Sequence, residues 1–268
     1  MKICLFCTFL LASQFLNAQP VATTQNVFII TIDGFRWQEV FKGADSALML
    51  NTHSVSDTSL LKQQYWDDCI EKRRTRLLPF FWNVIAKQGQ LLGNRAYGND
   101  VNVANRYKIS YPGYSEIFTG FPDKKFIPNL AVRNRNENIL NFLNEQKAYN
   151  GRVAAFSSWN VLPFILDEKM NGMPVNSGYE YLEETDDEEN ILINQVQKNI
   201  VHKTNTRHDL LTYASAKTYI EQKHPRVLFL GLGETFTTNH TVNNAIPLKP
   251  VEIIREKTSF PNMASLNK

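Results

Sequence analysis

Asp33 is the first residue whose type and position could support chemistry. It follows the apolar run of residues 26–32 (NVFIITI) and precedes Gly34. An ionised carboxylate at the end of a buried strand is costly unless it is paired or binds a metal. Asp33 is therefore a candidate metal ligand, and equally a candidate cap of the turn that follows.

Two serines in residues 105–120 (NRYKISYPGYSEIFTG) are candidate nucleophiles. Ser110 precedes the turn signal at residues 111–113, and a helix is predicted to begin at residues 115–118, with Glu116 in its first turn. A hydroxyl beside a helix N-terminus could attack phosphorus or sulfur, because the amide dipoles favour an anionic substrate. Without further context, the role of a helix cap is favoured over that of a nucleophile for either serine.

The elements that must position these residues alternate between strands and helices. Apolar, β-branched runs predict strands at residues 26–32, 152–156 and 226–232, the first of them buried on both faces. Helical periodicity occupies residues 78–88, 139–147, 191–201 and 209–222. This order predicts an α/β fold with a mostly parallel sheet flanked by helices, whose site lies beyond the carboxyl ends of the strands.

Three blocks of the sequence carry a family resemblance. The first is residues 26–45, which include the strand-end Asp33-Gly34. The others are residues 77–120 and residues 226–235 (RVLFLGLGET). Together they resemble the alkaline-phosphatase superfamily, in particular its secreted bacterial type I phosphodiesterase, phosphatase and sulfatase-like branch, over about residues 26–240. The resemblance implies an alkaline-phosphatase-like sheet that lacks its last strands.

The resemblance also implies roles for particular residues. Asp33 and the nucleophile share one metal of a two-metal site, usually zinc. Ser110 is preferred to Ser115 as the nucleophile because it precedes an aromatic-Pro pair. Asn129 is the nearest match to an asparagine that contacts the substrate's non-bridging oxygens. Two further asparagines compete for that role, Asn134 and Asn136.

The second metal site of the family is only partly represented. His240 stands at an expected ligand position, but Phe236 occupies the position of the expected aspartate, and no histidine follows His240 before Lys268. The implied function is metal-dependent hydrolysis of phosphoric or sulfuric esters by a serine nucleophile. The alternative is a truncated, catalytically inactive family remnant without the second metal site.

The N-terminus predicts export. Residues 1–18 combine Lys2, an apolar run and Ala18, which is typical of a cleaved signal peptide, and the run is shorter than the roughly 20 residues of a spanning helix. We expect a periplasmic or extracellular protein with no stable membrane anchor after cleavage. An alkaline-phosphatase-like domain at residues 19–240 and a divergent tail at residues 241–268 complete the predicted organisation.

The composition limits the classes of binding partner that we expect. The 268 residues include 29 Lys+Arg and 26 Asp+Glu, and this near balance argues against nucleic acid as a partner. A small-molecule phosphate or sulfate ester is the expected ligand. Three cysteines cannot form a disulfide framework, and Cys69, the one cysteine after residue 18, is predicted to be buried and inert. The charged stretches at residues 71–76 and 180–189 are predicted to be solvated surface.

Overall fold

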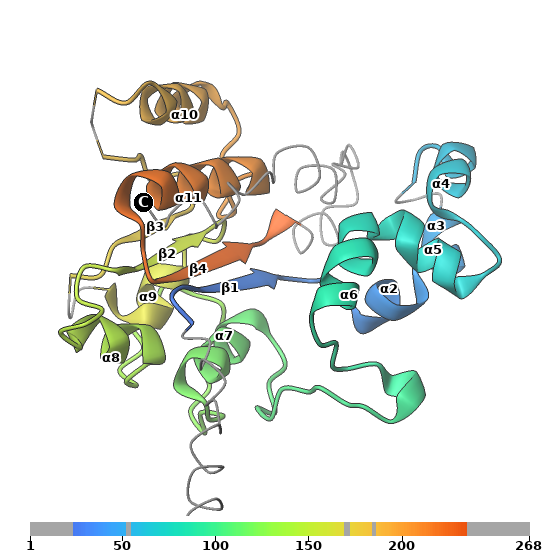
Figure 1. Cartoon of the computed structure of the whole chain (residues 1–268), viewed down its shortest axis with the longest axis horizontal. Helices are drawn as coiled ribbons and strands as arrows, with labels where there is room; N and C mark the ends of the chain where they lie inside the picture. The colour runs from blue at the N-terminus through green and yellow to red at the C-terminus, as the bar shows by residue number, and fades with distance from the viewer. Residues whose placement is uncertain (1–23, 52–54, 169–171, 184–185, 235–268) are drawn as a thin grey trace, which may run out of the picture.

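A four-stranded parallel sheet lies at the centre of the protein (Figure 1). The computed structural model describes residues 24–51, 55–168, 172–183 and 186–234. The predicted signal peptide, His240 and the predicted tail lie outside these residues. The order in the sheet is β1-β4-β2-β3, and every neighbouring pair is parallel. The strands are β1 (Val27–Ile32), β2 (Val153–Ser157), β3 (Val175–Ser177) and β4 (Val227–Leu232).

Helices surround the sheet, so the described residues form an α/β fold. The α-helices are α2 (Trp37–Lys42), α3 (Ser46–Met49), α4 (Thr58–Tyr65), α5 (Ile70–Leu77), α6 (Ala86–Gln88), α7 (Ser110–Thr119), α8 (Ile139–Glu145), α9 (Leu162–Leu166), α10 (Glu188–Asn199) and α11 (Asp209–Lys223). A π-helix (Phe81–Ile85) precedes α6, and a 3-10 helix spans Arg95–Tyr97. The three predicted strands are confirmed, as are the helices at α8, α10 and α11.

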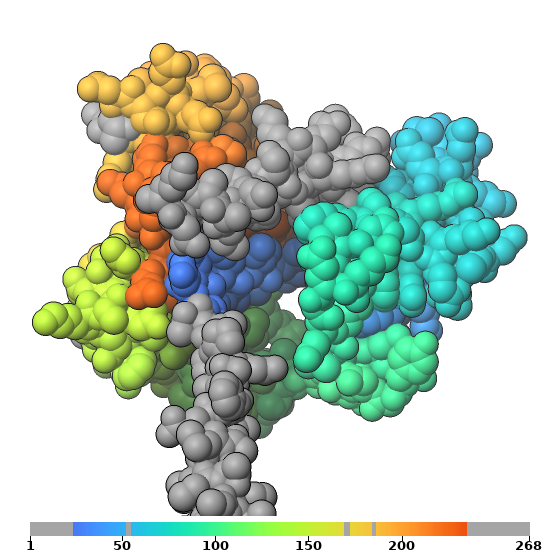
Figure 2. Space-filling view, viewed as in Figure 1, coloured from blue at the N-terminus to red at the C-terminus, as the bar shows by residue number. Residues whose placement is uncertain are grey.

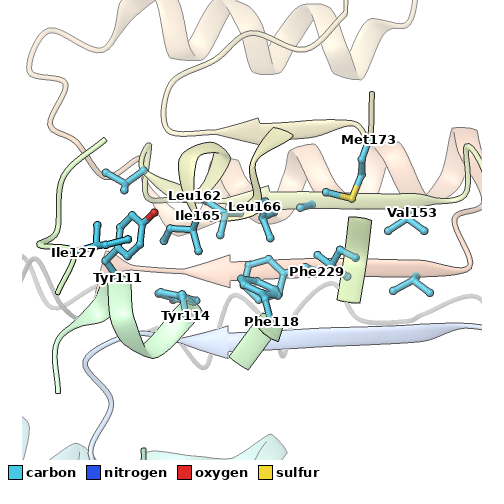
Figure 3. Packing of buried hydrophobic residues seen from close by; sticks show 14 residues of the cluster. Tyr111, Tyr114, Phe118, Ile127, Val153, Leu162, Ile165, Leu166, Met173 and Phe229 are labelled. Atoms are coloured by element: carbon cyan, nitrogen blue, oxygen red, sulfur yellow. The ribbon is translucent and has the colours of Figure 1, made fainter. Parts of the chain in front are cut away.

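The two faces of the sheet carry separate hydrophobic clusters. Helices α7, α8 and α9 pack on the face formed by Val153, Ala155, Val227 and Phe229 (Figure 3). Helix α11 packs on the other face, against residues of β2 and β4 such as Phe156 and Leu228. Because alternate residues of a strand point to opposite faces, the continuous apolar runs of β2 and β4 are buried on both sides.

Strand β1 does not match its predicted burial. It lies at one end of the sheet order, and each of its residues is exposed or half-buried. The prediction that it is buried on both faces is wrong for the described residues, because α11 covers β4 and β2 and leaves β1 open on that side. The apolar sequence of β1 is nevertheless typical of a strand in the interior of a sheet.

Three local predictions are also corrected. The helix predicted from residue 115 begins at Ser110, because Pro112 lies in the first turn of α7, where no helical N–H is needed. Residues 71–76, which precede the helix predicted at residues 78–88, themselves form most of another helix, α5. Cys69 is exposed, not buried, because it stands just before α5, and its thiol donates to a Glu71 carboxylate oxygen at 3.2 Å.

Helices α2 to α6 form a group beyond the carboxyl end of β1, to the right in Figure 1. Gly43 ends α2 at φ 80° and lets the chain pass against α5, since a Cβ there would lie 2.5 Å from the Arg74 backbone nitrogen. The Trp82 side chain contacts this group, since its indole N–H donates to the Val40 carbonyl at 3.0 Å. Among the described residues, no helix is long and apolar enough to cross a membrane.

Candidate functional site

Asp33 lies directly after β1, at the carboxyl edge of the sheet. Its backbone N–H donates to the Leu232 carbonyl at 2.9 Å, which continues the β1–β4 ladder by one residue. The Ser110 side chain lies beside the Asp33 carboxylate, near enough to favour its ionised form. Burial raises the pKa of Asp33, while Ser110 and the Gly34 N–H act in the opposite direction. The structure therefore brings together two of the residues singled out in the sequence.

A buried asparagine shapes the loop that leads to Ser110. Asn105 is 2% exposed, and its side-chain oxygen accepts from the Lys108 N–H at 2.9 Å. Lys108 adopts φ 53°, a left-handed conformation that is unusual outside glycine, and this bond helps to hold it. The Glu116 carboxylate accepts from the Asn105 N–H and side-chain amide, both at 2.8 Å. No local sequence pattern predicts these hydrogen bonds, because asparagine and glutamate are ordinary loop and helix residues.

Helix α7 is fixed to the sheet by aromatic side chains. The Tyr114 ring meets the Phe229 ring edge-on at 6.1 Å, and Phe118 meets Phe229 at 4.8 Å (Figure 3). The Tyr114 hydroxyl lies 3.3 Å from the Thr31 hydroxyl of β1. Burial, followed by the negative charge of Asp33, raises the pKa of Tyr114 above its usual range. The first turn of α7, which carries Ser110, is thereby held at the carboxyl edge of β1.

Asn129 also lies at the start of α7. Its side-chain oxygen accepts from the Tyr111 N–H at 2.8 Å, so it caps the helix from a distant loop. With the oxygen so engaged, the amide group presents its nitrogen as a hydrogen-bond donor beside the residue that follows Ser110. The two competing asparagines bind elsewhere: Asn134 donates to Ser115, and Asn136 donates to Asp123.

Ser115 has a structural environment that differs from that of Ser110. It is 3% exposed, and its hydroxyl oxygen accepts from the Asn134 side-chain amide at 3.0 Å. It lies in the middle of α7, and not at the helix N-terminus. A substrate could not reach this hydroxyl without opening the core, whereas Ser110 lies in the first turn.

A second polar cluster lies at the carboxyl end of β4. The Asp209 carboxylate accepts from the Ser158 hydroxyl at 2.5 Å, the Gly233 N–H at 2.8 Å and the Glu234 N–H at 3.2 Å. In return, the Glu234 carboxylate accepts from the Asp209 N–H at 2.7 Å, and its other oxygen lies 2.7 Å from His208 Nδ1. We call Asp209 and Glu234 the carboxylate clamp. Burial raises the pKa of Asp209 despite these hydrogen bonds.

The clamp adjoins a buried arginine. Arg207 is fully buried, and its guanidinium donates to Thr212 at 3.0 Å and to Asn176 at 2.8 Å. Burial lowers the pKa of Arg207 to about 10. Thr212 in turn lies 2.8 Å from the Ser158 hydroxyl that binds Asp209. The sequence pattern places Asp209 only at the start of the helix predicted at residues 209–222, because burial of a charged side chain leaves no local signal.

The described residues supply only part of the metal site that the resemblance implies. Asp33 and Ser110 together offer two oxygen donors, whereas a catalytic zinc site normally has three protein ligands. The described residues contain no group of three His, Cys, Asp or Glu side chains that could hold a metal ion. His240, the other predicted ligand, lies outside them. These residues alone therefore do not complete the centre that the resemblance implies.

Comparisons with protein-family models, with curated proteins and with solved structures found no match to this chain.

Proposed function

We propose that this protein is a hydrolase of phosphoric or sulfuric esters of small molecules, with Ser110 as its nucleophile, and that its sheet is of the alkaline-phosphatase type. The position of the Ser110 hydroxyl beside the Asp33 carboxylate carries the proposal. It places a nucleophile next to a proton acceptor at the carboxyl edge of a parallel sheet, where active sites of α/β proteins lie. The sequence resemblance supplies the reaction class.

The neighbouring groups support an anionic substrate. Ser110 lies in the first turn of α7, a helix of ten residues whose N-terminal dipole favours negative charge. The Asn129 amide nitrogen is a candidate donor to an ester oxygen, since its side-chain oxygen is held by the Tyr111 N–H. The raised pKa of Asp33 suits a group that accepts a proton during the reaction.

The proposed reaction has two steps. Ser110 Oγ bonds to phosphorus or sulfur, the bond from that atom to the leaving oxygen breaks, and the serine proton passes to Asp33. The leaving oxygen is protonated by water, and Asp33 then releases its proton to solvent. Water next attacks the phosphoserine or sulfoserine and restores the Ser110 hydroxyl.

The resemblance adds a divalent metal, zinc, to this proposal, and export to the periplasm or the exterior. A bound metal would stabilise negative charge on the ester oxygens. Because the described residues do not complete a metal site, the steps above use only the chain's own groups.

Two serine variants test the proposal. The full chain is assayed with an aryl phosphate, a bis-aryl phosphate diester and an aryl sulfate, each with and without added zinc. We expect Ser110→Ala to lower turnover at least about 10³-fold. Ser115→Ala is the matched control: it should keep turnover and lose about 1–2 kcal/mol of stability, because it removes the buried bond to Asn134. Mass spectrometry of the quenched reaction should locate the covalent group on Ser110.

Absence of turnover of all three esters by the unmodified, folded chain would contradict the proposal and favour the inactive family remnant. Equal turnover by the Ser110→Ala variant would contradict the assignment of the nucleophile while leaving the reaction class intact.

A further inference from the structure

We propose that residues 235–268 pack on the open face of β1, with the apolar stretch at residues 246–254 (IPLKPVEII) against the strand. This inference does not rest on the proposed function. It rests on the side chains that β1 leaves exposed and on the direction in which the chain crosses the sheet.

Three apolar side chains of β1 form one exposed patch, which we call the β1 patch: Phe28, Ile30 and Ile32. They are 36%, 55% and 39% exposed. The partners of Phe28 and Ile30 in register on β4, Leu228 and Leu230, are only 1% and 7% exposed, because α11 covers them. The patch therefore lies on the α11 face of the sheet, beside the part that α11 protects. Blue atoms of the N-terminal elements are visible on the surface in Figure 2.

The edge of β1 is open as well, within the part of the chain that the structure describes. The sheet order ends at β1, and the Val27 and Asp33 N–H groups donate toward β4. Since parallel pairing uses alternate residues, the N–H groups of the three patch residues point away from β4. An apolar, open edge strand promotes aggregation, and native proteins cover or charge such strands.

The connections across the sheet indicate which segment covers it. From β1 to β2 and from β2 to β3, the chain moves in one direction, and α7, α8 and α9 lie on one face. From β3 back to β4, the direction reverses, and α11 lies on the opposite face. This is the pattern expected when all the crossover connections between the parallel strands have the same handedness. A chain that leaves β4 and continues in the same direction, past β1, must therefore cross on the α11 face, where the β1 patch is exposed.

The segment that follows β4 has the length and composition for this position. It starts after Glu234, next to the carboxyl end of β1, and eleven residues, 235–245, precede the apolar stretch that begins at Ile246. Eleven extended residues reach about 36 Å, whereas the six residues of β1 span about 20 Å. Val251, Ile253 and Ile254 then offer branched apolar side chains to the patch.

Photo-crosslinking tests the occupant directly. Phe28 is replaced by p-benzoyl-phenylalanine in the full chain, and the same substitution at Phe142 is the control. Phe142 is an exposed phenylalanine, 46% accessible, on α8 of the opposite face. We expect Phe28→p-benzoyl-phenylalanine to crosslink within one chain to peptides of residues 246–254, and the Phe142 variant to give no such product.

A crosslinked product of twice the chain mass from the Phe28 variant would mean that a second copy covers the patch, and would overturn the proposal. Failure to crosslink to residues 235–268 would overturn it equally.

Hydrogen exchange gives a second test that leaves β1 unaltered. The double variant Ile253→Asp, Ile254→Asp should speed amide exchange in residues 27–32 at least about tenfold, with no comparable change in β2. Glu256→Gln is the control and should leave exchange in β1 as it is. Unchanged exchange in β1 of the double variant would overturn the proposal.

Discussion

Replacement of Asp209 by alanine should destabilise the protein strongly, although Asp209 is not in the proposed reaction. Its carboxylate joins the end of β4 to the first turn of α11 and to Ser158 after β2. We expect Asp209→Ala to lower the free energy of unfolding by about 4 kcal/mol. This value tests whether the carboxylate clamp holds the carboxyl edge of the sheet together.

The magnitude follows from the donors that would be left without an acceptor. Ser158 Oγ, Gly233 N and Glu234 N donate to Asp209 over 2.5, 2.8 and 3.2 Å. A hydrogen bond to a charged group contributes about 1.5–3 kcal/mol. Part of this gain is offset in the native protein, because burial disfavours the ionised carboxylate and raises its pKa. Loss of a partner from such a buried charged network costs about 3–5 kcal/mol.

Urea unfolding followed by circular dichroism at neutral pH measures the effect, with midpoint and slope compared between variants. Asp57→Ala is the matched control. Asp57 is an exposed cap of α4 that accepts from the Leu60 N–H at 2.8 Å, and its loss should cost about 1 kcal/mol. If Asp209→Ala costs no more than Asp57→Ala at an unchanged slope, the reasoning about the clamp is refuted.

Much of the sheet was predictable because its signals are local. The runs at β2 and β4 are apolar and β-branched, and this pattern requires burial on both faces, which the structure has. Residues 175–177, which form β3, escaped prediction because three residues carry no readable periodicity. For β1 the same apolar pattern predicted a strand correctly but mispredicted its surroundings, since what covers a strand is a property of distant segments.

The candidate site also combines features that local sequence signals predict with features that depend on distant segments. A strand-end aspartate and a serine beside a turn are local features, and Asp33 and Ser110 do meet. Their meeting depends on the packing of Tyr114 and Phe118 against Phe229, which spacing alone does not determine. The buried partners were not predictable at all, because Asn105 and Asp209 acquire their roles only when loops from distant parts of the chain converge.

Two further substitutions test the local geometry and the charge at the site. Gly43→Ala should destabilise the protein by about 2–4 kcal/mol in urea unfolding, because a Cβ would lie 2.5 Å from the Arg74 nitrogen. Gly98→Ala is the control: Gly98 is also at positive φ but has open space around it, so this variant should cost about 1 kcal/mol. Asp33→Asn should raise the melting temperature near pH 7, since burial raises the pKa of Asp33 above its ordinary 3.8 and the amide can take the same place beside Ser110. The parent protein loses stability relative to this variant as pH rises from about 3.8 through the raised pKa, so the advantage of the variant should be absent near pH 3 and constant once Asp33 is ionised. An advantage that instead shrank as pH rose would mean that the folded protein favours the ionised carboxylate, and that burial is not the dominant influence on Asp33.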